Sequence, residues 1–108
     1  MTATATLATL GGRTVHVDAE GFLTEYGEWD DDLARALAAQ IGITLTEPHW
    51  KAIRFLRDDY RDHGETATLR RITVVGGIPT KELFELFPNK PAKKLAYVAG
   101  LPKPRGCV

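Results

Sequence analysis

The sequence predicts a mostly α-helical fold, a small orthogonal helical bundle that begins with a β-hairpin and ends in a flexible arm. Apolar residues recur at helical spacing in several stretches between residues 33 and 99. Residues 14–17 alternate as in a strand, and residues 100–108 are rich in glycine and proline. Because 108 residues suit one domain, we expect a single helical domain over residues 1–99 and a mobile arm over 100–108.

The alternation at residues 14–17 predicts one strand of the N-terminal hairpin. Turn-forming residues follow at 18–21, and Phe22 and Leu23 come directly after them. An isolated two-stranded hairpin is marginally stable in water. This hairpin is therefore expected to cover one side of the helical core.

The first helix is expected after Trp29, with Asp30 or Asp31 as its N-cap and Gly42 at its end. Its apolar stripe consists of Leu33, Leu37 and Ile41 with Ala34, Ala36 and Ala38.

A longer stripe predicts a central core helix that begins after Thr46 as N-cap and ends at Gly64. Its apolar residues recur every three or four positions, namely Trp50, Ile53, Leu56 and Tyr60. Trp50 is expected to anchor the core, where truncation to alanine costs about 3–5 kcal/mol. Charged residues on the opposite face are expected to pair with one another, namely Lys51, Arg54, Arg57, Asp58, Arg61 and Asp62.

Three shorter helices complete the bundle. They are expected at residues 66–73, at 81–87 after a cap at Thr80, and at 91–99 after a start at Asn89. The apolar core candidates of the last two helices are Leu83, Phe84, Leu86, Phe87, Leu95, Val98 and Ala99.

The charges are unevenly distributed although the formal net charge is zero. Residues 18–32 carry seven acids and no Lys or Arg, whereas residues 88–108 carry five basic residues and no acid. Either the basic arm region docks on an acidic partner or on the protein's own acidic face, or both regions are solvated surfaces of opposite sign.

Several chemistries are excluded or disfavoured. The chain has no serine, so a Ser-His-Asp hydrolase is excluded. His16, His49 and His63 lack the spacing of metal ligands, and His49 is expected to be a packed or capping histidine. No apolar run approaches the roughly 20 residues that span a bilayer. We expect a cytoplasmic monomer that holds no metal or cofactor.

The C-terminal arm carries the sole cysteine, Cys107, one residue from the end. Pro102 and Pro104 favour an extended backbone, while Gly100 and Gly106 supply hinges. At roughly 3.3 Å per residue, such an arm carries its thiol about 20 Å from Gly100. This reach suits delivery of a sulfur atom into the pocket of another protein.

Two cations lie near that thiol in the sequence. Lys103 and Arg105 favour the thiolate, which is the nucleophilic form, whereas the carboxylate of Val108 opposes them.

The pattern Gly-Leu-Pro-Lys-Pro-x-Gly-Cys resembles the arm of the DsrC/TusE family of sulfur-relay proteins. The resemblance covers nearly the whole chain in the right order, through Gly21-Phe22-Leu23, Trp29, residues 42–50, Arg54-Phe55-Leu56-Arg57 with Tyr60, Leu86-Phe87-Pro88 and Pro91-Ala92-Lys93.

The resemblance implies a fold with winged-helix-like elements and a persulfide on Cys107. It implies a sulfurtransferase-type carrier rather than a turnover enzyme, without a cofactor of its own. Its donor would be a complex of the DsrE/TusBCD kind, and its acceptor an MnmA-type thiouridylase that forms 2-thiouridine in tRNA. The alternative within the family is sulfur oxidation or sulfite-reductase-linked trafficking.

The chain departs from the family pattern at two places. Members that work with dissimilatory sulfite reductase have a second cysteine where this chain has Ala96. The segment between Arg70 and Leu86 is shorter, and Val74 replaces a frequent lysine.

A helix-turn-helix DNA binder is the alternative from another class. Short helices and the arginine pair Arg70 and Arg71 suit it, whereas the zero net charge and the lack of nearby base-reading Asn or Gln disfavour it.

Overall fold

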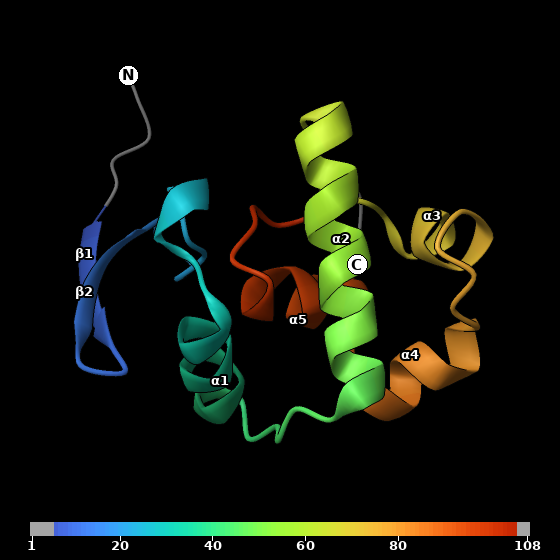
Figure 1. Ribbon diagram of the computed structural model, residues 1–108, viewed down its shortest axis with the longest axis horizontal. Helices are drawn as coiled ribbons and strands as arrows, with labels where there is room; N and C mark the ends of the chain where they lie inside the picture. Colours follow the sequence, from blue (N-terminus) through green and yellow to red (C-terminus); the bar gives the residue numbers. More distant parts are fainter. Residues whose placement is uncertain (1–5, 106–108) are drawn as a thin grey trace.

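The computed structural model describes residues 6–105. Two strands precede five helices, with a 3-10 turn between the two groups (Figure 1). The elements are β1 (Thr6–Leu10), β2 (Arg13–Val17), η1 (Tyr26–Glu28), α1 (Asp31–Gln40), α2 (Glu47–His63), α3 (Leu69–Val74), α4 (Thr80–Leu86) and α5 (Pro91–Val98). The predicted mostly helical fold with an N-terminal hairpin is confirmed.

The hairpin pairs β1 with β2, in the register Leu10 opposite Arg13. Gly11 and Gly12 form its turn with φ of 57° and 80°, the positive values that a tight two-residue hairpin turn requires. The turn that the sequence predicts at residues 18–21 is also present, since the Gly21 amide donates to the Asp18 carbonyl at 3.0 Å, but it is not the turn that joins the two paired strands. The segment after residues 18–21 makes only an isolated bridge, between Val17 and Leu23.

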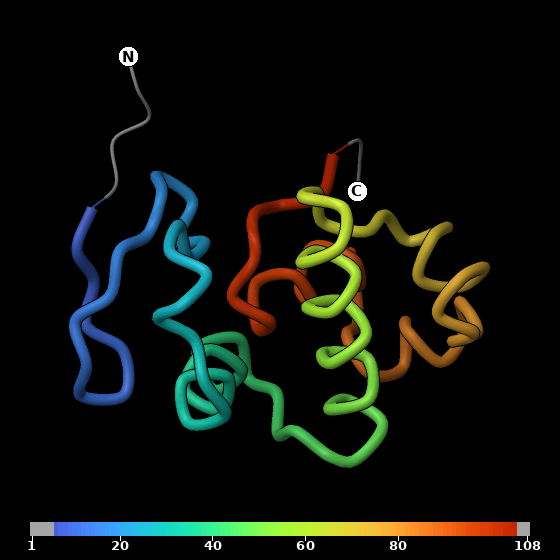
Figure 2. Tube along the Cα trace, turned by 45° about the horizontal axis from the view of Figure 1, so that its top comes forward, coloured from blue at the N-terminus to red at the C-terminus, as the bar shows by residue number. Residues whose placement is uncertain are grey.

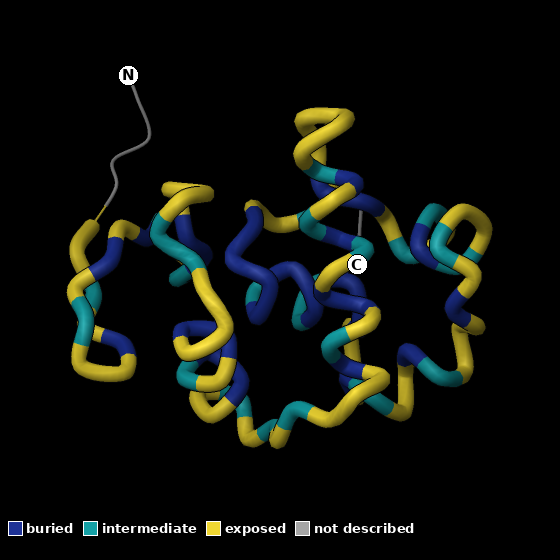
Figure 3. Tube along the Cα trace, viewed as in Figure 1, coloured by how far each residue is buried: buried dark blue, intermediate teal, exposed yellow. Residues whose placement is uncertain are grey.

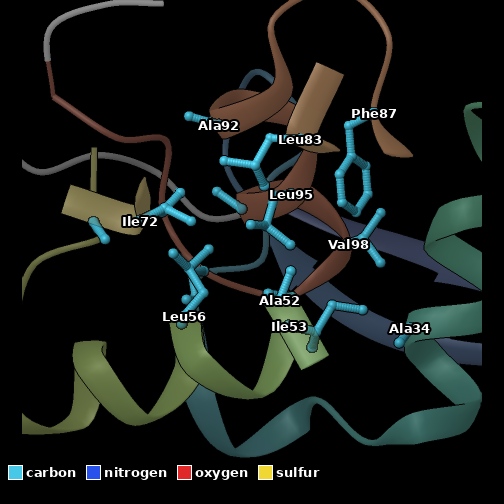
Figure 4. Packing of buried hydrophobic residues seen from close by; sticks show 14 of the residues in the cluster. Ala34, Ala52, Ile53, Leu56, Ile72, Leu83, Phe87, Ala92, Leu95 and Val98 are labelled. Carbon is cyan, nitrogen blue, oxygen red and sulfur yellow. The ribbon is translucent and has the colours of Figure 1, made fainter. Parts of the chain in front are cut away.

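A main hydrophobic core surrounds α5, which contacts α1, α2 and α4. Buried residues gather there in the middle of the molecule (Figure 3). In Figure 4, Leu95 of α5 lies among side chains of α2 and α4, including Ile53 and Leu83. All three of these residues are fully buried. The orthogonal bundle is therefore organised around its last helix.

A second, smaller cluster joins the hairpin to α1. Its buried members are Leu10, Val15, Val17, Leu23, Leu33 and Leu37. The hairpin thus covers one side of the helical core, as the sequence predicts.

The buried face of α2 includes the predicted Ile53 and Leu56 but differs from the prediction at its two ends. It consists of His49, Ala52, Ile53, Leu56 and Asp59. Trp50 is only half-buried and contacts the core from its edge, because it lies about 100° around the helix from His49. Trp50 thus packs against the core without being fully enclosed by it, and the cost of truncating it stays a prediction.

The predicted histidine cap is confirmed. The Thr46 amide donates to His49 Nδ1 at 3.0 Å, which places the ring proton on Nε2. That Nε2 lies 3.0 Å from the Leu86 carbonyl oxygen and donates to it. The His49 ring therefore accepts a hydrogen bond from the N-cap residue of α2 and donates one to the last carbonyl group of α4.

The shorter helices also differ in detail. α3 begins at Leu69, where the Thr68 side chain caps it, rather than at residue 66. Leu83 of α4 and the C-cap residue Phe87 are buried, whereas Phe84 is 46% exposed, because residues four apart share a face. Lys90, not Asn89, is the N-cap of α5.

Candidate functional site

The base of the C-terminal arm is part of the core. Gly100 ends α5 with φ of 71° and is buried, and Leu101 is fully buried. The Leu101 amide donates to the Ala96 carbonyl at 3.0 Å. The chain becomes exposed only from Pro102 onward, so the first two residues of the predicted arm are packed into the body.

A hydrogen bond holds the next residue of the arm. The buried Thr66 hydroxyl donates to the Pro102 carbonyl at 2.8 Å. Figure 2 shows this segment running from α5 alongside the C-terminal end of α2. The arm therefore has a fixed base that extends to Pro102.

Two side chains satisfy the carbonyl groups that the end of α5 leaves without helical partners. Trp29 Nε1 donates to the Val98 carbonyl at 2.9 Å, and Arg57 Nη1 donates to the Ala99 carbonyl at 2.8 Å. Arg57 Nη2 also donates to the Tyr26 carbonyl at 3.1 Å. We call Tyr26, Trp29 and Arg57 the arm clamp.

Stacking reinforces the arm clamp. The Arg57 guanidinium carbon lies 4.0 Å from the Tyr26 ring centroid and 4.1 Å from the Trp29 ring centroid. Burial lowers the pKa of Arg57, although an arginine remains a cation at neutral pH. The sequence analysis placed Arg57 on a charged surface whose residues pair with one another. The spacing of residues within α2 could not reveal its partners, the carbonyl groups of Tyr26 and Ala99, which are 31 and 42 residues away.

The exposed part of the arm lies on the protein's own acidic residues. Lys103 Nζ donates to both Glu20 carboxylate oxygens at 3.0 and 3.2 Å, and Arg105 lies 3.8 Å from Glu65. The hydrogen bond from Lys103 lowers the pKa of Glu20. Among the described residues, the pair of Lys103 and Glu20 joins the arm to the acidic stretch at residues 18–32, whereas docking on an acidic partner stays a prediction.

Gly106 and Cys107 lie outside the described residues. The mobility of the arm, and the effect of Lys103 and Arg105 on the thiolate, remain predictions.

Comparison with known proteins decides the family. A family model described as DsrC like protein matches residues 9–108. The chain belongs to this DsrC-like family.

Several relatives and solved structures resemble this family member along nearly their whole lengths. The protein named sulfurtransferase TusE from Pectobacterium atrosepticum is 39% identical over 104 residues, 90% of this chain and 95% of the relative. That of Escherichia coli K12 is 35% identical with the same coverage. The solution structure of Allochromatium vinosum DsrC has a TM-score of 0.80 and 36% identity, covering 97% of this chain and 100% of that one. The oxidised DsrC, or gamma-subunit of dissimilatory sulfite reductase, of Archaeoglobus fulgidus has a TM-score of 0.75 and 37% identity, covering 95% and 100%.

Ala96 of this DsrC-like chain contacts the base of the arm. This residue is fully buried in α5, and its carbonyl accepts the Leu101 amide. The side chain at position 96, where the resemblance implies a second cysteine in some family members, is therefore enclosed in the core of this chain.

The arginine pair considered for DNA binding is divided by the fold. Arg71 donates to both carboxylate oxygens of Asp59, with Nε at 2.9 Å from Oδ2 and Nη2 at 2.8 Å from Oδ1. These hydrogen bonds lower the pKa of Asp59, which is buried. Arg70 is exposed, whereas Arg71 is only partly exposed and is paired with Asp59, so the two arginines do not form a joint unpaired basic surface.

Proposed function

We propose that this protein is a sulfur carrier that accepts sulfane sulfur as a persulfide on Cys107 and passes it to an acceptor protein. Membership of the DsrC-like family and the relatives named sulfurtransferase TusE support the carrier role. The observation that carries the assignment to this residue is its position. Cys107 is the sole cysteine, and it lies five residues beyond Pro102, the last residue of the fixed arm base.

The proposed transfer follows thiol–disulfide exchange with one sulfur replaced. The Cys107 thiolate attacks the outer sulfur of a donor persulfide, the sulfur–sulfur bond of the donor breaks, and the donor thiolate leaves. The proton of the outer sulfur stays with it, so Cys107 ends as a persulfide. A thiolate of the acceptor then attacks the same outer sulfur, and Cys107 returns to its thiolate. Neither step needs a cofactor or an added oxidant.

The partners proposed are a DsrE/TusBCD-type donor complex and an MnmA-type tRNA thiouridylase. The name of the relatives supports the tRNA branch, and so does Ala96, because the chain has no second thiol for dithiol chemistry. Sulfur oxidation or sulfite-reductase-linked trafficking is the alternative. Among residues 6–105, no helix is long and apolar enough to cross a membrane. We propose a cytoplasmic monomer.

Intact-mass spectrometry after incubation with inorganic polysulfide tests the assignment. The wild-type protein should gain one sulfur atom that a reductant removes. The variant Cys107→Ser should gain none while it keeps its melting transition, since Cys107 lies outside every core stripe that the sequence predicts. A Cys107→Ser protein that retains the added sulfur contradicts the assignment.

A further inference from the structure

A hollow of about 350 Å³ lies along one face of α5, opposite Phe22 and Ile41. Helical spacing brings Lys93, Lys94 and Tyr97 of α5 to this hollow, and Lys90, the N-cap residue of α5, also lines it. We call this hollow the lysine pocket.

The walls of the lysine pocket are apolar. Phe22 is buried and packs edge-on against Tyr97, with 5.6 Å between the ring centroids, and Ile41 is half-buried. Burial raises the pKa of Tyr97, so its phenol is an uncharged hydrogen-bonding group at neutral pH. A binding site of this kind combines apolar walls with a few polar groups that orient the ligand.

The charge at the mouth is positive. Glu20 is the carboxylate among the lining residues, and it already accepts two hydrogen bonds from Lys103. Lys93 is more distant from Glu20, at 4.0 Å, and Lys94 donates to the Pro88 carbonyl rather than to an acid. Cations therefore outnumber carboxylates here. The hollow beside Trp50 is closer to balance, with three arginines and two aspartates, and carboxylates outnumber the lysine in the hollow beside Pro79.

Helix stability alone does not account for these lysines. The N-terminus of a helix is its positive end, where acids stabilise and cations destabilise. α1 follows this rule with Asp31 and Asp32 in its first turn, whereas the first turn of α5 has no acid and its N-cap residue, Lys90, makes no side-chain cap. Asn89 and Lys90 also have positive φ, of 62° and 45°, and such backbone strain concentrates at functional sites.

We propose that the lysine pocket is the docking site for an acidic segment of a partner protein that inserts an apolar side chain between Phe22 and Tyr97. Carboxylates of this segment pair with Lys90 and Lys93. The proposal rests on the sulfur-carrier function, because a carrier must bind its donor and its acceptor.

The location of the pocket suits such a partner. Glu20 is at once a wall of the pocket and the residue that holds Lys103 of the arm. Cys107 is four residues beyond Lys103, a span of roughly 13 Å when extended. A partner docked in the lysine pocket therefore has the sulfur-carrying residue within reach.

Titration of the isotope-labelled full chain with blocked hexapeptides, followed by amide NMR spectra, tests the proposal. The probe alternates glutamate and leucine. One control peptide replaces glutamate by glutamine, and the other replaces leucine by glycine. The probe should shift the amide signals of Ile41, Lys93 and Tyr97 saturably. Both controls should bind about tenfold more weakly, because one lacks the carboxylates and the other lacks the apolar side chains.

Matched lysine variants complete the test. Lys90→Gln with Lys93→Gln should weaken probe binding about tenfold, whereas Lys51→Gln with Lys81→Gln, the same charge change outside the pocket, should not. Absent shifts, shifts centred elsewhere, equal binding of all three peptides, or equal effects of the two double variants overturn the proposal. The pocket variant should still gain sulfur from polysulfide. Failure of docking is therefore distinguishable from failure of the carrier function.

Discussion

Trp29 Nε1 donates a hydrogen bond to the carbonyl oxygen of Val98, which is 69 residues away in the sequence, at a distance of 2.9 Å. This bond joins the segment before α1 to the last turn of α5. The same indole stacks on Arg57, which binds the next carbonyl, that of Ala99. The base of the arm is thus held by residues from two distant parts of the chain.

Gly100→Ala should destabilise the protein strongly. A Cβ atom at this position would lie 2.4 Å from Trp29 Cδ1, and φ is 71°. The left-handed backbone costs about 1 kcal/mol, and the overpacking adds about 1–3 kcal/mol. Chemical denaturation measures this loss. Gly42→Ala is the matched control, because φ there is 74° and nothing lies within 4 Å, so it should lose about 1 kcal/mol. Equal losses in both variants would show that Trp29 yields to the methyl group.

Arg57→Met should release the arm clamp. The change removes donors from the Tyr26 and Ala99 carbonyls together with both ring stacks, and a lost charged hydrogen bond costs about 1.5–3 kcal/mol. Amide hydrogen exchange at Leu101 should also become faster, because the arm base loses its support. Arg54→Met, an exposed neighbour, should change stability by about 0.5 kcal/mol or less. Unchanged exchange at Leu101 would contradict the role of Arg57.

Trp50→Ala should cost less than the sequence predicts. Trp50 is half-buried, whereas Ile53 is fully buried in the core. We expect Ile53→Ala to lose about 2–5 kcal/mol and Trp50→Ala about 1–2 kcal/mol, as measured by urea denaturation. If the tryptophan change costs more, the indole contributes as a core residue would.

Acid should weaken the pair of Asp59 and Arg71. The hydrogen bonds from Arg71 hold the pKa of Asp59 below its ordinary value, so the pair stabilises the fold above the unfolded value of about 3.9. This stability is lost as pH falls through the lower folded pKa. The raised pKa of Arg71, caused by its bond to Asp59, agrees in sign.

Comparison with Asp59→Asn isolates this effect. The variant should be about 2 kcal/mol less stable than wild type at pH 7, because Asp59 is buried but Arg71 is partly exposed. The difference should stay constant down to about pH 4 and shrink below it. Urea denaturation at several pH values measures it, and a difference that persists unchanged at the lowest pH contradicts the assignment.

Local patterns in the sequence determined the helices and the family. The capping residue, the stripe of period 3.6 and the terminating glycine of a helix all lie in one continuous stretch of sequence, so α1 and α2 were predictable. The penultimate cysteine and its glycine–proline context indicated the relay family, which the comparisons confirm. The same local reasoning did not find β1. It placed the hairpin turn after the strand at residues 14–17, whereas the partner strand β1 precedes that strand in the sequence.

Only the tertiary structure decided how the arm meets the body. Leu101 follows a glycine and precedes a proline, a context typical of an exposed tail, yet it is fully buried. Arg57 lies on the charged face of α2, yet it binds the ends of two other segments. Helix periodicity identifies which residues share a face, but not which distant carbonyl groups need a donor. That need arises only when α5 ends against Trp29, so it depends on contacts between residues far apart in the sequence.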